Sequence, residues 1–411
     1  MKNFIVILIS MLCMISCSGN TDKVSENDFM RIDGQHLITP DGERFFIKGT
    51  NLGCWLNPEG YMFGFTWASS PRLINRMFCE LVGPDRTAEF WKRFKDNYIT
   101  KADIEFIASC GANTIRIPFN YRLFTDEDYM GLTSDQDGFE RMDAAIEWCK
   151  EYGLYVILDM HDAPGGQTGD NIDDSYGYPW LFESEKSQEL FYDIWTRIAE
   201  HYRNETAILG YELMNEPIAP YFKNMEELNT KFLPLCKETV TRIREVDPNH
   251  IIIIGAPQWN TNFKPVTDWS FDNKIMFTCH RYGGEAGAEG IKDYIEFRDK
   301  TGLPMYMGEI GHNTMEWQET YSRTMQENNI GYTFWPYKKR DIECMRAFDV
   351  PEDWDKVVVA FANSNRLDFG NIREARPDQE TAWKAMCQFT ENIRFENCHT
   401  LDEYVQSMLL K

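Results

Sequence analysis

The sequence predicts a (β/α)8 barrel, in the α/β class, and two observations support that prediction. Short apolar segments alternate with amphipathic segments along the 411 residues, as expected when helices cover a parallel sheet. Polar and charged side chains also gather where the apolar segments end, and in this fold catalytic groups lie at the carboxyl ends of the strands. Parallel barrels often exceed the usual length of one domain, so we expect a single catalytic domain.

The eight predicted strands are nearly continuous in apolar residues, as strands buried on both faces are. In chain order they span residues 45–48, 114–117, 155–159, 208–214, 251–254, 274–278, 305–307 and 332–335. The clearest of them, 251–254, is four consecutive isoleucines. Runs of this kind favour a buried parallel sheet over a half-exposed one.

The segments between the strands have the apolar spacing of helices, most clearly the long amphipathic segment 184–202. The predicted helices are 102–110, 141–151, 184–202, 225–246, 289–301 and 315–328. Two long segments, 57–88 and 164–182, are predicted loops on the substrate side of the barrel. Segment 381–410 is predicted to be a closing helical segment, and the chain has no internal repeat.

The N-terminus has the pattern of a targeting segment. Lys2 precedes an apolar run of about a dozen residues, shorter than the roughly 20 needed to span a bilayer. The run ends at Ser16-Cys17-Ser18, which is typical of a bacterial lipobox. We predict a signal peptide over 1–16, a polar tether over 17–28 with a lipidated Cys17, and the catalytic domain over 29–411. An ordinary secretory signal cleaved nearby is the alternative.

Composition narrows the class of partner. The net charge of −23 argues against nucleic acid and anionic membrane surfaces and favours a neutral substrate. The 12 Trp, 19 Tyr and 27 Phe suit a protein that stacks on sugar rings, although most aromatic side chains serve as core. We expect an exported outer-membrane lipoprotein on the periplasmic or cell-surface side, monomeric, in contact with the membrane only through its lipid.

Two glutamates end predicted strands and indicate the chemistry. Glu216 follows strand 208–214 in Asn215-Glu216-Pro217, and Glu309 follows strand 305–307 in Gly308-Glu309. Glycosidic bond cleavage needs one carboxyl group to protonate the leaving oxygen and another to meet the positive charge at the anomeric carbon. The pair therefore predicts a glycoside hydrolase.

Other polar and aromatic residues fall at the same predicted edge. Arg116, His161, His280 and Trp335 stand at or just beyond the ends of strands two, three, six and eight. We predict that the histidines position Glu216 and the substrate, and that Trp335 stacks beneath the sugar. No acidic cluster with His at metal-ligand spacing accompanies them, and the nine cysteines after Cys17 are scattered, so no metal or other cofactor is predicted.

These motifs together resemble glycoside hydrolase family 5. The matching segments are Ile115-Arg116-Ile117-Pro118, Leu158-Asp159-Met160-His161, Asn215-Glu216-Pro217, His280-x-Tyr282, Gly308-Glu309 and Phe334-Trp335. The resemblance implies Glu216 as acid/base and Glu309 as nucleophile. It also implies a surrounding shell of Arg116, His161, Asn215, His280, Tyr282 and Trp335.

Within that family, two stretches are similar to the exo-β-1,3-glucanase branch and its β-1,6-glucanase relatives. They are 48–56, followed by Glu59, and the loop 161–169. The resemblance implies that Glu59 binds a terminal glucose and that the substrate is a β-glucan polysaccharide, an oligosaccharide or a β-glucoside.

Two alternatives remain open at the level of sequence. One is an endo-β-1,4-glucanase or mannanase on the same scaffold, and the other is a catalytically silent glycan-binding lipoprotein, against which the presence of both glutamates argues. The aromatic residues that either extend the sugar subsites or pack in the protein are Tyr178, Trp180, Trp259 and Tyr337.

Overall fold

The computed structural model describes residues 24–131, 134–340 and 342–411. The predicted signal peptide, Cys17 and most of the tether lie outside the described residues. Within the described ranges, no helix combines the length and the apolar character needed to cross a membrane.

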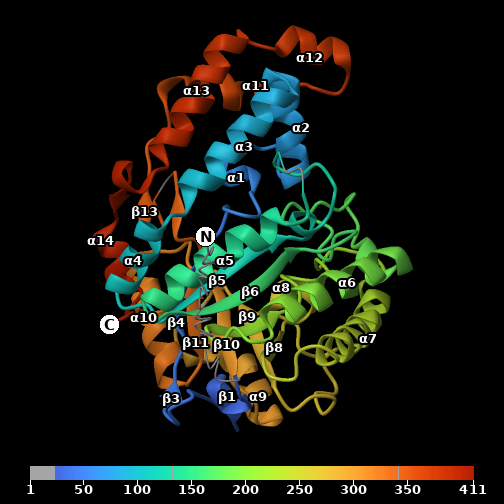
Figure 1. The fold of residues 1–411 in the computed structure, drawn as a ribbon, viewed down its shortest axis with the longest axis vertical. Helices are drawn as coiled ribbons and strands as arrows, with labels where there is room; N and C mark the ends of the chain where they lie inside the picture. The colour runs from blue at the N-terminus through green and yellow to red at the C-terminus, as the bar shows by residue number, and fades with distance from the viewer. Residues whose placement is uncertain (1–23, 132–133, 341) are drawn as a thin grey trace, which may run out of the picture.

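Eight parallel strands close into a barrel, which confirms the predicted fold class (Figure 1). Neighbours in the barrel follow chain order, and the last strand pairs with the first, Phe334 opposite Thr50. The barrel strands are β4 (Lys48–Asn51), β5 (Thr114–Asn120), β6 (Tyr155–Asp162), β7 (Ile208–Glu212), β8 (Ile251–Ile254), β9 (Ile275–His280), β10 (Met305–Ile310) and β11 (Gly331–Phe334). Apart from the first residue of β4 and of β6, all their residues are buried, as the apolar runs predict.

Helices lie outside the barrel between successive strands, within a few residues of the predicted positions. They are α4 (Lys101–Ser109), α5 (Asp137–Glu151), α6 (Glu185–Tyr202), α7 (Met225–Arg244), α9 (Lys292–Thr301) and α10 (Met315–Glu327). The loops that lead from each strand to the next helix therefore all begin at the same end of the barrel.

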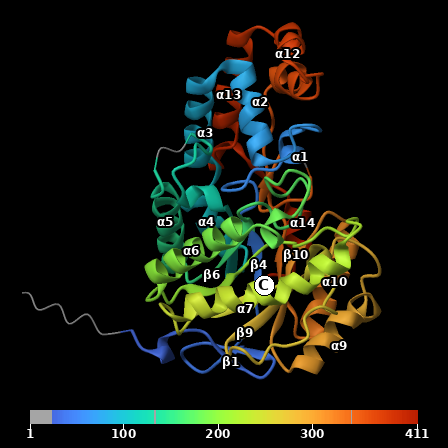
Figure 2. The ribbon, with the colours of Figure 1, turned by 90° about the vertical axis from the view of Figure 1, so that its right-hand side faces the viewer.

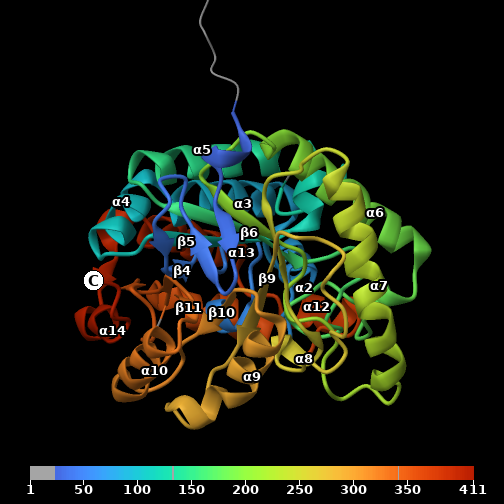
Figure 3. The ribbon, with the colours of Figure 1, turned by 90° about the horizontal axis from the view of Figure 1, so that it is seen from below.

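The predicted first strand, 45–48, is wrong by about three residues. Arg44–Phe45 (β3) instead joins β1 (Arg31–Asp33) and β2 (His36–Ile38) in a small antiparallel sheet. This sheet covers the amino-terminal end of the barrel, seen from below in Figure 3. Leu37 and Ile47 are buried there against apolar side chains of the barrel strands, including Ile157. The apolar residues 45–47 thus pack between the small sheet and the barrel, which explains why this segment resembles a barrel strand in sequence.

The predicted loop 57–88 is also wrong, because it contains helices. It holds α1 (Gly60–Phe63), α2 (Pro71–Val82) and the start of α3 (Pro84–Tyr98). These helices pack with α13 (Gln379–Asn392) at the end of the molecule opposite the small sheet (Figures 1 and 2). An aromatic cluster joins the two distant segments, with Phe63 5.7 Å and Trp354 4.0 Å from Phe389 between ring centroids.

The predicted loop 164–182 and the predicted closing helical segment 381–410 agree with the structure to different extents. Segment 164–182 is a loop except for a single turn at Trp180–Phe182. The C-terminal segment 381–410 is not one helical piece, because β14 (His399–Thr400) separates α13 from α14 (Asp402–Ser407).

Candidate active site

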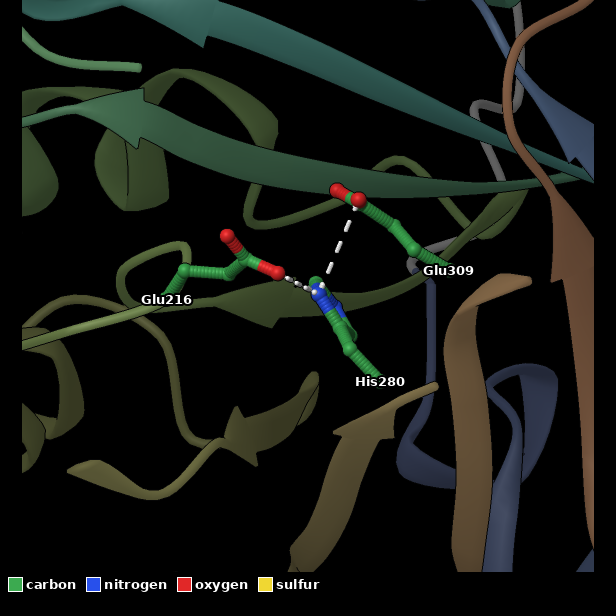
Figure 4. A group of neighbouring side chains, drawn as sticks. All are labelled: Glu216, His280 and Glu309. Atoms are coloured by element: carbon green, nitrogen blue, oxygen red, sulfur yellow. Dashed lines mark hydrogen bonds and ion pairs between the residues drawn. The ribbon is translucent and has the colours of Figure 1, made fainter. Parts of the chain in front are cut away.

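The two predicted catalytic glutamates meet at the carboxyl end of the barrel. Glu309 lies in β10, and Glu216 stands four residues beyond the end of β7. One oxygen of each carboxylate and a ring nitrogen of His280 lie within 4.8 Å of one another, and both carboxylates point toward that ring (Figure 4). Both glutamates are therefore placed to act on one bond.

Glu309 is held by two donors and faces a positive charge. The Arg116 Nη1 group donates to Oε1 at 2.8 Å, and the Tyr282 hydroxyl donates to Oε2 at 2.5 Å. Charged hydrogen bonds of this kind favour the ionised carboxylate. Both partners were predicted to belong to the site.

Arg116 is fully buried, and its positive charge is close to two carboxylates in addition to that of Glu309. Its guanidinium also forms ion pairs with Asp159 at 3.0 Å and Glu212 at 2.7 Å. These carboxylates hold the pKa of Arg116 well above its usual value, against the effect of burial. Burial raises the pKa of Asp159 to about 7 and also raises that of Glu212, although Arg116 opposes both shifts. Neither acid is among the site residues predicted from sequence, although an ionisable residue inside an apolar strand is a visible signal.

Glu216 sits in a different environment. His280 Nδ1 lies 2.8 Å from its Oε1, and the Thr168 hydroxyl donates to its backbone carbonyl at 2.8 Å. Its backbone is left-handed, with φ of 45°, which is uncommon outside glycine and marks a constrained position. Burial first, and then the charges of Glu309 and Glu59, raise the pKa of Glu216 well above its usual value.

Asn215, His161 and Asp159 form a connected row beneath the site. Arg116 Nη2 donates to Asn215 Oδ1 at 2.9 Å, so the Asn215 amide nitrogen faces His161 Nε2 at 3.3 Å. His161 Nδ1 in turn lies 2.7 Å from Asp159. Burial lowers the pKa of His161 to about 3, so the ring is neutral at ordinary pH.

Trp335 lies at the end of β11, where it was predicted. Its ring stacks on His161 with centroids 5.2 Å apart and an interplanar angle of 2°. The indole nitrogen donates to the Tyr61 hydroxyl at 2.8 Å. The helical segment that holds Tyr61 therefore helps to fix the orientation of the ring.

Glu59 reaches the same pocket from the residue before α1. It is only 3% exposed, and its Oε1 has no hydrogen-bond partner among the described residues. His161 Nε2 lies 3.9 Å from that oxygen. Burial and the charge of Glu309 raise the pKa of Glu59 well above its usual value. An unpaired buried carboxylate oxygen is costly unless a ligand supplies donors.

Two cavities meet at Glu216 and Tyr282. One, of about 330 Å³, is lined by Glu59, Tyr61, His161, Ile172, Asn215, Glu216, Tyr282, Glu309, His312 and Trp335. The other, of about 550 Å³, is lined by Glu216, Trp259, Thr261, His280, Arg281, Tyr282, Asp293 and Tyr294. A bond held beside Glu216 would have one side in each cavity.

His312 lines the first cavity, although no sequence motif marks it as a site residue. Its backbone is left-handed, with φ of 50°, and its Nε2 lies 3.5 Å from the Lys339 ammonium. Burial and Lys339 lower its pKa to about 4. A neutral ring whose Nε2 accepts from Lys339 has Nδ1–H available as a donor.

The four aromatic residues that the sequence left undecided are separated by the structure. Tyr337 is fully buried and donates to Asp103, so it belongs to the core. Tyr178 packs against Phe222, and Trp180 is 45% exposed at the end of the same loop. Trp259 lines the second cavity.

Among the described residues, one group of acids and histidines has a spacing that could hold a metal ion, namely Glu216, His280 and Glu309. Arg116 already places a positive charge on Glu309, and His280 Nδ1 is bonded to Glu216. The donor set is thus accounted for by contacts between protein groups.

Comparisons with known proteins give a consistent picture. The family model described as cellulase (glycosyl hydrolase family 5) matches residues 80–341. A β-xylosidase of Phanerodontia chrysosporium is 31% identical over 69% of this chain and 61% of its own length. Endoglucanase C of Acetivibrio thermocellus is 30% identical over 62% of this chain and 88% of its own length.

Two further similarities are more distant. A glucan 1,3-β-glucosidase of Kluyveromyces lactis is 30% identical over 43% of this chain and 44% of its own length. The crystal structure of rutinosidase from Aspergillus niger superposes with a TM-score of 0.57 at 21% identity, covering 72% of this chain and 90% of that one. The last similarity concerns the fold alone.

Proposed function

The chain belongs to the cellulase family of glycosyl hydrolases, family 5, and from that premise we propose a retaining β-glycosidase that acts on β-glucan or β-glucosides. The observation that carries the proposal is the convergence of Glu216 and Glu309. Glu309 is bound by the Arg116 cation, whereas Glu216 is half-buried and forms no ion pair with a Lys or Arg of the described residues. Such an asymmetry assigns different roles to two carboxyl groups.

Glu309 is proposed as the nucleophile. Arg116 and Tyr282 keep it ionised and fix both oxygens, so that one of them can attack the anomeric carbon. Covalent bonding to the sugar removes the charge of Glu309 and forms a glycosyl-enzyme intermediate.

Glu216 is proposed as the acid/base. Its raised pKa keeps the proton in place for the leaving oxygen. When the intermediate forms, the nearby charge of Glu309 disappears, and the pKa of Glu216 falls. Glu216 can then accept a proton from the water that releases the sugar.

The separation of the two carboxylates supports retention. Inverting enzymes hold their carboxyl groups about 6.5–9.5 Å apart to admit a water, whereas retaining enzymes hold them about 5–5.5 Å apart. Oxygens within 4.8 Å of each other fit the closer spacing.

Exo action is supported by Glu59. Glu59 lines the cavity of about 330 Å³, where two adjacent hydroxyls of a terminal glucose could donate to its carboxylate. An internal sugar has one of these positions occupied by the rest of the chain. The similarity to glucan 1,3-β-glucosidase favours a β-1,3- or β-1,6-linked substrate, whereas the similarity to endoglucanase C favours the endo alternative.

A product profile tests this proposal. The enzyme should be offered laminarin, pustulan, cellulose, mannan and aryl β-glucosides, with the anomer of early products followed by NMR. We expect glucose as the early product, released first as the β-anomer. Early long oligosaccharides would establish endo action, and an α-anomer would contradict the retaining mechanism.

We also propose that Cys17 anchors the enzyme by lipid to the outer membrane. The first described residues lead into the small sheet at the amino-terminal end of the barrel, opposite the helical end (Figure 2). A lipid at Cys17 would therefore leave the site on the side of the barrel that faces away from the membrane. The proposal rests on the lipobox pattern and is tested below.

A further inference from the structure

Asn260 forms a row with His280 and Glu216. The Asn260 amide nitrogen lies 3.2 Å from His280 Nε2, and His280 Nδ1 lies 2.8 Å from Glu216 Oε1. Asn260 is the last residue of the short element α8 (Pro257–Asn260) after β8, His280 ends β9, and Glu216 lies in the loop after β7. Figure 4 shows the imidazole between the two catalytic carboxylates.

The orientation of the Asn260 amide follows from its other contact. The backbone N–H of Ala256 donates to Asn260 Oδ1 at 3.1 Å. A backbone N–H can only donate, so the amide oxygen must face Ala256 and the NH2 group must face His280. Since an NH2 group cannot accept, His280 Nε2 is the acceptor.

The protonation of His280 is thereby determined. Burial and the charge of Arg116 lower the pKa of His280 well below the usual value, so the ring is neutral. A neutral imidazole with an accepting Nε2 has its proton on Nδ1. That Nδ1–H donates to Glu216 Oε1, which leaves Oε2 as the oxygen that can hold a proton.

We infer that Asn260 is a positioning residue, which holds His280 in the Nδ1–H tautomer and so directs the catalytic proton of Glu216 to Oε2. The inference rests on the proposed acid/base role of Glu216. It adds a residue that touches neither substrate nor reacting atoms.

The backbone around Asn260 has an unusual conformation that supports the contact between Asn260 and His280. Residues 258, 259 and 260 are consecutively left-handed, with φ of 55°, 60° and 58°. Such conformations persist only where neighbouring structure determines them, and here the Gln258 backbone donates to the Ile218 carbonyl at 3.0 Å. The loop that contains Asn260 is thus tied to the loop that contains Glu216.

Two glycines leave room for the row formed by Asn260, His280 and Glu216. A Cβ atom at Gly255 would lie 2.0 Å from Asn260 Oδ1, and one at Gly308 would lie 3.0 Å from His280 Nε2. Any side chain at Gly255 would displace the amide. A Cβ at Gly308 would crowd the nitrogen that accepts from it.

The first test is spectroscopic and needs no substrate. In protein labelled with ¹⁵N-histidine, His280 should show the Nδ1–H tautomer, its signal identified by its loss in His280→Gln among the seven histidines. Asn260→Asp keeps the shape but cannot donate, so the proton should move to Nε2. The matched control is Asn262→Asp, two residues on, whose amide donates to Gln258 at 2.7 Å. It should leave the tautomer unchanged.

The second test compares leaving groups. In Asn260→Asp, His280 Nδ1 becomes an acceptor and draws the Glu216 proton to Oε1. Turnover of alkyl or oligosaccharide β-glycosides should fall about ten- to a hundredfold, since protonation limits them. A dinitrophenyl glycoside needs no proton in the first step and should lose less than about threefold. Should Asn260→Asp fail to fold, Gly255→Ala should give the same pattern.

An Nε2–H tautomer in the wild type, or equal losses for both kinds of leaving group, would overturn the inference. If the wild type cleaved no β-glycoside at all, the proposed function would fail instead, and the tautomer measurement would still decide the arrangement of Asn260 and His280.

Discussion

Glu59 offers a perturbation that should lower activity and raise stability together. The side chain is 3% exposed, one oxygen lacks a hydrogen-bond partner in the part of the chain that the structure describes, and Glu309 adds repulsion to the cost of burial. In the complex, sugar hydroxyls would supply the missing donors. Glu59→Gln removes the charge while it keeps the size of the side chain, so it separates the two effects from packing.

The loss of activity follows from the hydrogen bonds to the sugar. A hydrogen bond to a charged group contributes about 1.5–3 kcal/mol, and each 1.36 kcal/mol is a factor of ten in rate. For an aryl β-glucoside we expect kcat/KM to fall about ten- to a hundredfold. The β-anomer should remain the first product, because the catalytic pair is intact.

The gain in stability follows from the unpaired charge. A buried polar group without a partner costs on the order of 1–3 kcal/mol, so Glu59→Gln should raise the free energy of unfolding by that order. The folded state of the wild type binds the Glu59 proton more tightly than the unfolded state does. Wild-type stability therefore falls as pH rises above the unfolded pKa, about 4.3, toward the raised folded value, and the advantage of the variant should grow over that range.

The assay combines kinetics with urea unfolding at pH 4 and pH 8. Glu374→Gln, which removes an exposed charge on α12 (Phe369–Ala375), serves as the matched control and should change neither quantity. If Glu59→Gln kept its kcat/KM and gained no stability at pH 8, the assignment of Glu59 as an unpaired sugar-binding carboxylate would be refuted.

The other predictions concern the catalytic pair and the anchor. Glu309→Gln should abolish turnover of every substrate, whereas Glu216→Ala should spare the first step with dinitrophenyl glycosides and be partly rescued by azide; identical behaviour of the two variants would contradict the division of roles. Burial and Glu309 raise the pKa of Glu216, so on the alkaline side wild-type kcat/KM should begin to fall only when the pH reaches that raised value. Glu216→Ala should lose this alkaline limb of the pH profile. Cys17→Ala should move the enzyme from the membrane fraction to the soluble fraction at unchanged specific activity; a wild type already found in the soluble fraction would rule out the anchor.

The sequence alone determined the barrel and its catalytic edge. Continuous apolar runs such as 251–254 indicate strands buried on both faces, and a closed parallel sheet brings all their carboxyl ends together. Residues as distant as Arg116 and Glu309 could therefore be placed in one site without knowledge of any contact. The structure puts them 2.8 Å apart.

Only the tertiary structure decided which further side chains serve that edge. The helices within 57–88 are held by contacts with α13, where Phe63 packs against Phe389, and such pairing of distant segments has no local signal. The burial of Glu59 without a hydrogen-bond partner among the described residues, and the position of His280 opposite the Asn260 amide, also depend on non-local contacts. Apolar periodicity predicts which faces of a chain are buried, but the environment of a polar group is set by the neighbours that the fold brings to it.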